Sequence, residues 1–197
     1  MQVYHIPAAA PLYTNTFLLL GGKGHAVAVD PNAAPEQYLS LLKEKGARLT
    51  HILLTHGHHD HVGAVEVLRR ETGARVYLGA QDTGGSSLFP FTSPDAGYTD
   101  GETIAVDDMA FTVITTPGHS AGSVCLLCGE LLFAGDTLFA GDIGRTDLAG
   151  GSWDEMQKSL LKLAQTVPDT AQVLPGHEEF SAMGDEKKNN RYLAAVL

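Results

Sequence analysis

The chain has 197 residues, 44% of them hydrophobic, so it is long enough to bury a substantial core within one domain. Its formal net charge of −10, with no cluster of Lys and Arg, excludes a typical nucleic-acid-binding protein, because a polyanion is bound by concentrated positive charge. The N-terminal segment has no basic start, and Pro11 and the polar residues 14–16 interrupt its apolar run. We therefore expect a cytoplasmic protein that contacts neither nucleic acid nor a membrane.

Short apolar runs predict nine β-strands. They lie at residues 16–20, 26–29, 51–54, 75–78, 103–106, 111–115, 123–127, 131–134 and 172–174. Helical patterns occupy residues 35–46, 61–73, 152–166 and 185–197. Pro35 suits a first helical turn, Gly46 and Gly73 suit helix ends, and Ser152 with Glu155 has the spacing of a capping box. This mixture indicates one layered α/β domain over residues 1–197, and it leaves open whether the strands form one sheet or two.

Two further segments call for an interpretation. Residues 79–102 are rich in Gly, Ser, Pro and Asp and exceed an ordinary connector, so they form either a loop at the mouth of a site or a surface excursion. Cys125 and Cys128 form a C-x-x-C motif inside an apolar run. Because no second cysteine pair exists and the surroundings favour strands, we expect buried cysteines rather than a zinc site or a redox centre.

The segment ILLTHGHHDHVGAV carries the clearest chemical signal. A predicted buried strand runs directly into His56, His58, His59, Asp60 and His61. Imidazole and carboxylate groups are the usual protein ligands of zinc, manganese and iron, and a loop that leaves a strand can turn several of them toward one point. The alternative is a solvated polar loop with accidental histidines, which the regular apolar flanks disfavour.

Three later residues have a similar setting. His119 and His177 each follow an apolar strand and a Pro-Gly pair, and Asp136 follows a strand that ends in two small residues. The repetition predicts loops that meet at a common rim. A carboxylate has two oxygens that can each bind one cation, so Asp136 is the natural candidate to bridge two metal ions.

Together these motifs resemble the metallo-β-lactamase superfamily. Its T-H-x-H-x-D-H pattern appears as Thr55–His61, and the match extends from Asp30 in VAVDPN to PGHEEF. The resemblance implies a metallo-β-lactamase-type αβ/βα sandwich with metals at one sheet edge. Carried over by position, it implies a first metal on His56, His58 and His119, a second on Asp60, His61 and His177, and Asp136 as the bridge.

Within the superfamily, GDTLFAGDIGRTD is most similar to the hydroxyacylglutathione hydrolases, or glyoxalase II enzymes, and their compact bacterial relatives. That likeness implies a small-molecule thioester substrate such as S-lactoylglutathione. It also implies two divalent cations, zinc first with iron or manganese as alternatives, about 3.5–4 Å apart and activating a bridging hydroxide as nucleophile. Asp60 would be a ligand, an acceptor of the water's proton, or both. The best-known zinc β-lactamases carry Cys where Asp136 stands, which disfavours a β-lactam substrate.

The chain departs from the glyoxalase II pattern near its C-terminus. Full-length members bind glutathione through a C-terminal helical extension, whereas twenty residues follow His177 here, and Glu178 replaces the usual Gly. Arg145 is the nearest candidate to bind an anionic substrate group, while Lys187, Lys188 and Arg191 are expected to be solvated surface charges. Asp30, Thr55 and Asn15 are expected to support the site by hydrogen bonds, and His59 to be a bystander.

Two other functions compete with the hydrolase. A persulfide dioxygenase would use a single iron on His56, His119 and Asp136, and oxygen consumption dependent on that iron would reveal it. A metal-binding module without catalysis would carry metal but show no esterase or thioesterase activity. The full ligand set for two metals favours the hydrolase, while the native metal, the exact substrate and the oligomeric state are left open.

Overall fold

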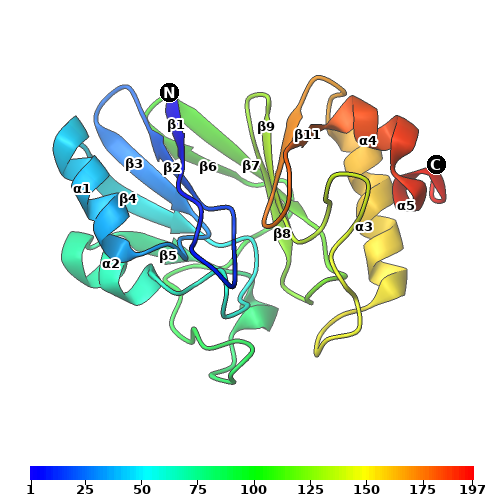
Figure 1. Ribbon diagram of the computed structural model, residues 1–197, viewed down its shortest axis with the longest axis horizontal. Helices are drawn as coiled ribbons and strands as arrows, with labels where there is room; N and C mark the ends of the chain where they lie inside the picture. Colours follow the sequence, from blue (N-terminus) through cyan, green and yellow to red (C-terminus); the bar gives the residue numbers. More distant parts are fainter.

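The computed structural model describes residues 1–197, and its strands form two sheets packed face to face (Figure 1). The first sheet has the order β1-β2-β3-β4-β5, with β1 Gln2–His5, β2 Phe17–Leu20, β3 His25–Val29, β4 Arg48–Leu53 and β5 Arg75–Tyr77. The second has the order β11-β10-β9-β8-β7-β6, with β6 Thr103–Val106, β7 Met109–Thr115, β8 Val124–Cys128, β9 Leu131–Gly135, β10 Gln172–Pro175 and β11 Ser181–Ala182. The expected αβ/βα sandwich is confirmed.

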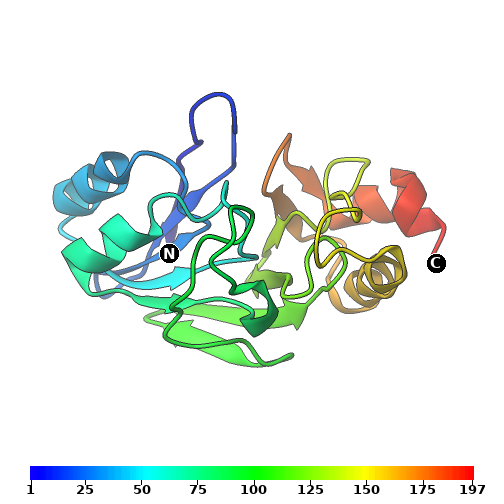
Figure 2. The same ribbon diagram turned by 90° about the horizontal axis from the view of Figure 1, so that it is seen from below.

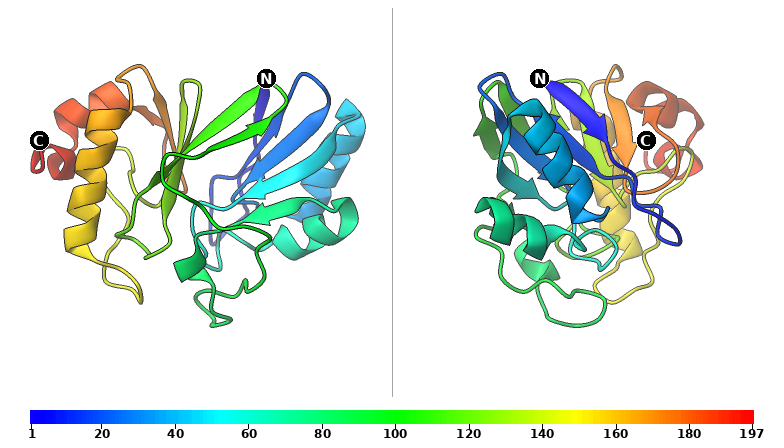
Figure 3. Two further views of the ribbon diagram at one scale, coloured as in Figure 1. Left: turned by 180° about the vertical axis from the view of Figure 1, so that it is seen from behind. Right: turned by 60° about the vertical axis from the view of Figure 1, so that its left-hand side comes forward.

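Helices cover the outer face of each sheet, which gives four layers (Figures 2 and 3). The first sheet carries α1 (Pro35–Lys45) and α2 (Val65–Thr72), which lie between its parallel strands β3, β4 and β5 along the chain. The second carries α3 (Trp153–Thr166), α4 (Met183–Asn189) and α5 (Arg191–Ala194). A short 3-10 turn, η1 (Ala80–Asp82), follows β5.

Strand periodicity explains how one sheet serves two cores. In β2, Phe17 and Leu19 point into the cluster between the sheets, whereas Leu18 and Leu20 point to the cluster beneath α1 and α2. Successive strand side chains face opposite sides, so a continuous apolar run is required when both faces are covered. Cys125 and Cys128 are buried and unbonded in β8, as expected.

The strand and helix predictions hold, with three differences. β1 and β11 were missed because β1 is mostly exposed and β11 has only two residues, so neither shows an apolar run. The helix predicted over residues 185–197 is wrong: Asn190 divides it into α4 and α5. Its backbone is non-helical (ψ 115°), and its side chain caps α5 by accepting hydrogen bonds from the amides of Tyr192 and Leu193.

The C-terminal helices also hold a loop of the central region. The Asn190 side-chain amide donates to the carbonyls of Phe139 (3.4 Å) and Asp142 (3.0 Å). The Glu186 carboxylate accepts from the amide of Gly141 (2.9 Å). Residues 139–142 are thus fixed by two side chains at the end of α4. No helix of the chain is both long and apolar enough to cross a membrane.

Candidate metal centre

All seven predicted metal ligands lie in loops that leave strand ends at one rim of the sandwich. His56 to His61 follow β4, His119 follows β7, Asp136 follows β9, and His177 follows β10. The two sheets meet directly here, because the amide of Val124 at the start of β8 donates to the carbonyl of Thr55 (2.8 Å). Side chains from both halves of the chain therefore share one site.

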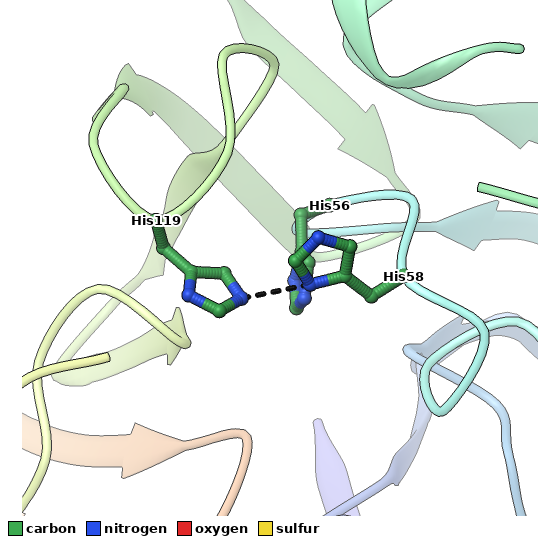
Figure 4. A group of neighbouring side chains, drawn as sticks. All are labelled: His56, His58 and His119. Carbon is green, nitrogen blue, oxygen red and sulfur yellow. Dashed lines mark hydrogen bonds between the residues drawn. The ribbon is translucent and has the colours of Figure 1, made fainter. Parts of the chain in front are cut away.

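His56, His58 and His119 form the first set of candidate ligands, called here the three-histidine group (Figure 4). All three are buried, and one ring nitrogen of each lies within 4.8 Å of the others. The Nε2 atom of His119 lies 2.8 Å from Nδ1 of His58. Two ring nitrogens at hydrogen-bond distance can instead share a cation when both rings present a lone pair.

Asp60, His61 and His177 form the second set, called here the Asp60 group, with ligand atoms also within 4.8 Å. The Nε2 atom of His177 lies 3.2 Å from Oδ2 of Asp60. His61 is fully buried, whereas the other two are partly open to solvent. The second group therefore faces the outside more than the first does.

Asp136 lies between the two groups. Its Oδ1 is 3.4 Å from Nε2 of His61, and its Oδ2 is 3.5 Å from Nε2 of His119 and 3.7 Å from Nε2 of His177. Oδ2 therefore lies near a histidine of each group, and Oδ1 faces His61. From this position the carboxylate can contact cations held by either group.

Orphaned polar atoms indicate that the residues fit a metal. Nε2 of His56, Nε2 of His61 and Oδ1 of Asp136 are buried without a hydrogen-bond partner. Unpaired buried polar groups are costly, and metal ions are among the partners that compensate them. The donor set, five imidazoles and two carboxylates, suits zinc, iron or manganese.

The opposite ring nitrogens have fixed partners. Nδ1 of His61 lies 3.0 Å from Oδ2 of Asp30, and Nδ1 of His119 lies 2.8 Å from the carbonyl of Arg145. Such contacts fix the orientation and tautomer of a metal-ligating imidazole. Only the inward-facing nitrogens then remain available to a cation.

Asp30 supports ligands of both groups, as the sequence predicted for hydrogen bonding. Its carboxylate accepts from the amide (2.7 Å) and hydroxyl (2.6 Å) of Thr55 and contacts His61 directly. Thr55 in turn orients His56, since its Oγ1 lies 3.1 Å from Nδ1 of His56. One buried carboxylate thus orients one histidine directly and a second through Thr55.

The electrostatics prepare the imidazoles for a cation. Burial and the neighbouring imidazoles lower the pKa of His56 well below its usual value, and burial with His119 lowers the pKa of His58 to about 4. Burial also opposes the charged form of His61, but Asp136 and Asp30 outweigh it and raise its pKa well above the usual value. The lowered pKa values favour neutral rings at His56 and His58, the form that binds a metal, whereas the raised pKa of His61 favours its protonated form.

A cavity of about 400 Å³ opens onto the cluster. Its walls include Leu88, Phe139 and Leu148 as well as Arg145 and exposed His59. Leu88 comes from the long segment 79–102, which settles that segment as a loop at the site mouth. His59 belongs to neither ligand group. Lys187 does not line the cavity and binds Asp169 instead (2.6 Å).

Sequence reasoning missed two residues beside the ligands. Thr14 Oγ1 donates to the carbonyl of Asp60 (2.7 Å), and buried Asp82 accepts three hydrogen bonds from the loops of the three-histidine group. Asp82 stands within the long irregular segment, where an isolated Asp looks like any turn residue. The only available signal was the excess length of that segment.

The profile of the Metallo-beta-lactamase superfamily matches residues 9–177. The chain is 33% identical to an uncharacterized protein of Aquifex aeolicus (100% of this chain, 99% of the relative). It is 29% identical to hydroxyacylglutathione hydrolase GloC of Haemophilus influenzae, with 98% of each protein covered.

Solved structures show the same arrangement. BLEG-1 B3 metallo-beta-lactamase has a TM-score of 0.88 at 31% identity, covering 98% of this chain and 99% of that one. ETHE1 from Myxococcus xanthus has a TM-score of 0.85 at 29% identity, covering 99% and 85%. TTHA1623 in a di-iron-bound form has a TM-score of 0.82 at 32% identity, covering 96% and 99%. From its sequence and its fold alike, the chain belongs to the metallo-beta-lactamase superfamily of metal-dependent hydrolases.

Proposed function

We propose that the protein hydrolyses thioesters of the S-lactoylglutathione type and uses two divalent cations to do so. Zinc is the first candidate for these cations. The observation that carries the proposal is the division of seven side chains into two ligand groups with Asp136 between them. A single-metal site would not need Asp60, His61 and His177 to converge as well. The likeness to a hydroxyacylglutathione hydrolase over 98% of both chains supports the choice of a thioester.

Two bound cations would polarise the substrate carbonyl and lower the pKa of a water molecule, so that it attacks near pH 7. Side chains of the protein orient the reactants. Although burial raises the pKa of Asp60, the hydrogen bond from His177 and the charge of His61 outweigh it, and the carboxyl stays ionised. Asp60 is partly open to the cavity, where its ionised carboxylate can accept a hydrogen bond from the attacking water and orient it. A thiol has a pKa of about 8.5, so the leaving thiolate needs no acid.

The cavity wall has an apolar part that suits the acyl group of the substrate and a cationic part that suits a substrate carboxylate. Leu88, Phe139 and Leu148 form an apolar surface beside the ligands and exclude water from the acyl group. Arg145 is the one cationic side chain on that wall. Its guanidinium forms two bonds with Asp147 (2.7 and 2.8 Å), but both side chains are more than 60% exposed. Solvent and salt screen an ion pair this exposed, so a substrate carboxylate can displace Asp147.

The Arg145→Ala variant is expected to raise KM for S-lactoylglutathione about 3- to 10-fold with kcat almost unchanged, because the guanidinium binds away from the reacting bond. The His119 contact is kept, since it uses the backbone carbonyl. The S-lactoyl thioester of N-acetylcysteamine, which has no carboxylate, serves as the control substrate. Equal losses with both thioesters would show that Arg145 binds no carboxylate.

The function is tested by hydrolysis of S-lactoylglutathione by metal-free protein reconstituted separately with zinc, manganese and iron. Activity should follow metal content, and His119→Ala should lower kcat/KM by about 10²-fold or more, as for loss of a metal ligand. His25→Ala is the matched control, because His25 lies outside both ligand groups and pairs with Asp107.

Other outcomes would point elsewhere. A cephalosporin belongs in the substrate panel, because BLEG-1 B3 metallo-beta-lactamase is structurally similar. Inactivity of every metallated form toward thioesters would overturn the proposed reaction. Oxygen consumption with a persulfide, dependent on one bound iron, would establish the dioxygenase in its place.

A further inference from the structure

Asp82 is a buried carboxylate that forms no hydrogen bond with a candidate metal ligand or with a residue that lines the cavity. It is 1% exposed and ends η1, the short turn after β5. Its three hydrogen-bond donors all come from the loops that carry the three-histidine group. Those donors are the amide of Gly57 (3.0 Å), the amide of Gly122 (2.7 Å) and the hydroxyl of Ser120 (2.6 Å).

The donors divide between two loops from different sheets. Gly57 lies between His56 and His58 after β4 of the first sheet, whereas Ser120 follows His119 after β7 of the second sheet. One carboxylate therefore binds the backbone next to His58 and the residue next to His119. Asp82 is the one side chain outside the ligand set that is hydrogen-bonded to both loops.

The two loops pack closely against Asp82. A Cβ atom on Gly57 would lie 2.5 Å from the carbonyl oxygen of Asp82, and one on Gly122 would lie 2.7 Å from its Cγ. Real Cβ atoms do not approach other atoms so closely, so only glycine fits at either position. Asp82 thus fills the gap between two loops that approach it without side chains.

The hydroxyl network has one consistent direction. Ser120 Oγ donates to Asp82 and lies 2.6 Å from Ser123 Oγ, which in turn accepts from the amide of Ser120 (3.2 Å). The Ser123 hydroxyl must therefore donate to Ser120, because the proton of Ser120 is used on the carboxylate. Of these bonds, the one from Ser120 to Asp82 has a carboxylate acceptor, which makes it the strongest of the three.

We propose that Asp82 is a positioning residue that sets the spacing between His58 and His119, and through it the metal affinity of the three-histidine group. The inference rests on the proposed metal centre. Partners of this kind typically change metal affinity 10- to 100-fold when removed.

Asn15 supports the Asp60 group in a comparable way. A variant at this position should therefore affect the metal-binding constant that an Asp82 variant leaves unchanged. Its side-chain amide donates to the carbonyls of Pro175 (3.1 Å) and Glu178 (2.9 Å), on either side of His177. Both bonds of its amide nitrogen thus end in the loop that carries His177, while its Oδ1 contacts His5 (2.8 Å) outside the site. Asp82 and Asn15 should therefore act on different metal-binding constants.

The experiment titrates metal-free full-length protein with zinc in competition with a chromophoric chelator, which resolves two binding constants. The His119→Ala and His177→Ala variants assign one constant to each group. Asp82→Asn is expected to weaken the three-histidine constant about 10- to 100-fold and the other less than 3-fold. Asn15→Ala is expected to show the reverse pattern.

Asp95→Asn is the matched control for charge and for loop anchoring. Asp95 also accepts a backbone amide, that of Val76 (2.8 Å), and it binds Arg69, but it contacts neither ligand loop. Neither zinc constant should change in this variant. The visible spectrum of the cobalt-substituted protein gives a second readout, since the altered group changes its coordination bands.

Equal weakening of both constants in Asp82→Asn, or no weakening, would overturn the proposal. If Asp82→Asn does not fold, Ser120→Ala removes only one of the three bonds and should weaken the same constant by a smaller factor. Failure of the wild-type chain to bind two zinc ions would instead contradict the proposed metal centre. The two failures are therefore distinguishable.

Discussion

Replacing Asp136 with asparagine is expected to lower kcat/KM for a thioester by about 10³-fold, which is about 4 kcal/mol of activation free energy. The carboxylate faces His61 and His177 of one ligand group and His119 of the other, so its loss affects both metals. An amide has one oxygen and no charge, and cannot bind two cations with equal strength. Steady-state kinetics and bound metal per chain measure the effect together.

Asp142→Asn supplies the control. Asp142 lies six residues further on, its carboxylate accepts only the amide of Ile143 (2.9 Å), and it belongs to neither ligand group. Its activity and metal content should equal those of the wild-type protein. A fully metallated and active Asp136→Asn protein would refute the bridging role.

Gly176→Ala is expected to lower kcat about 10²-fold, although the substitution adds a single methyl group. The new Cβ atom would lie 2.2 Å from Oδ1 of Asp136 and 2.6 Å from Cε1 of His61. The backbone cannot retreat, because Gly176 is hydrogen-bonded to Gly135 (2.8 Å) and Asn15 (2.7 Å) on its two sides. Both ligands must move, and a displacement of about 1 Å can cost about 10²-fold in rate.

Gly84→Ala makes the same chemical change in open space. No atom lies within 4 Å of a Cβ at Gly84, and its φ is not in the left-handed region. This control should keep wild-type kinetics and thermal stability. Wild-type activity in Gly176→Ala would mean that the ligand loops are looser than their packing indicates.

The fold could be predicted largely because its strands carry period-two or continuous apolar patterns. Alternation in β6 and continuous burial in β2 are read directly from residue types. Periodicity alone could not predict the division into two sheets, because it records which faces are buried but not which strands pair; the family resemblance predicted that division. The break at Asn190 was missed because, beside its local cap on α5, the Asn190 side chain binds Phe139 and Asp142, about 50 residues away in the chain. The single domain over residues 1–197 stays a prediction.

The candidate ligands were predictable for a different reason. Histidines and aspartates that follow strand ends stand out against an apolar background, as at His56 and Asp136. Their assignment to two metals stays a prediction, although the structure brings them together in two groups. Asp82 could not be found, because its role depends on two glycines that approach it only in the folded chain.

The hydrogen bonds from the end of α4 to residues 139–142 let the C-terminal segment influence the reaction, although this segment does not contact the reacting groups. Phe139 lines the cavity, and its backbone carbonyl is held by Asn190. A change in the packing of the terminal helices can therefore shift Phe139 on the cavity wall without replacing any of the seven candidate ligands. Substrate preference can diverge along this route between relatives that share one catalytic apparatus.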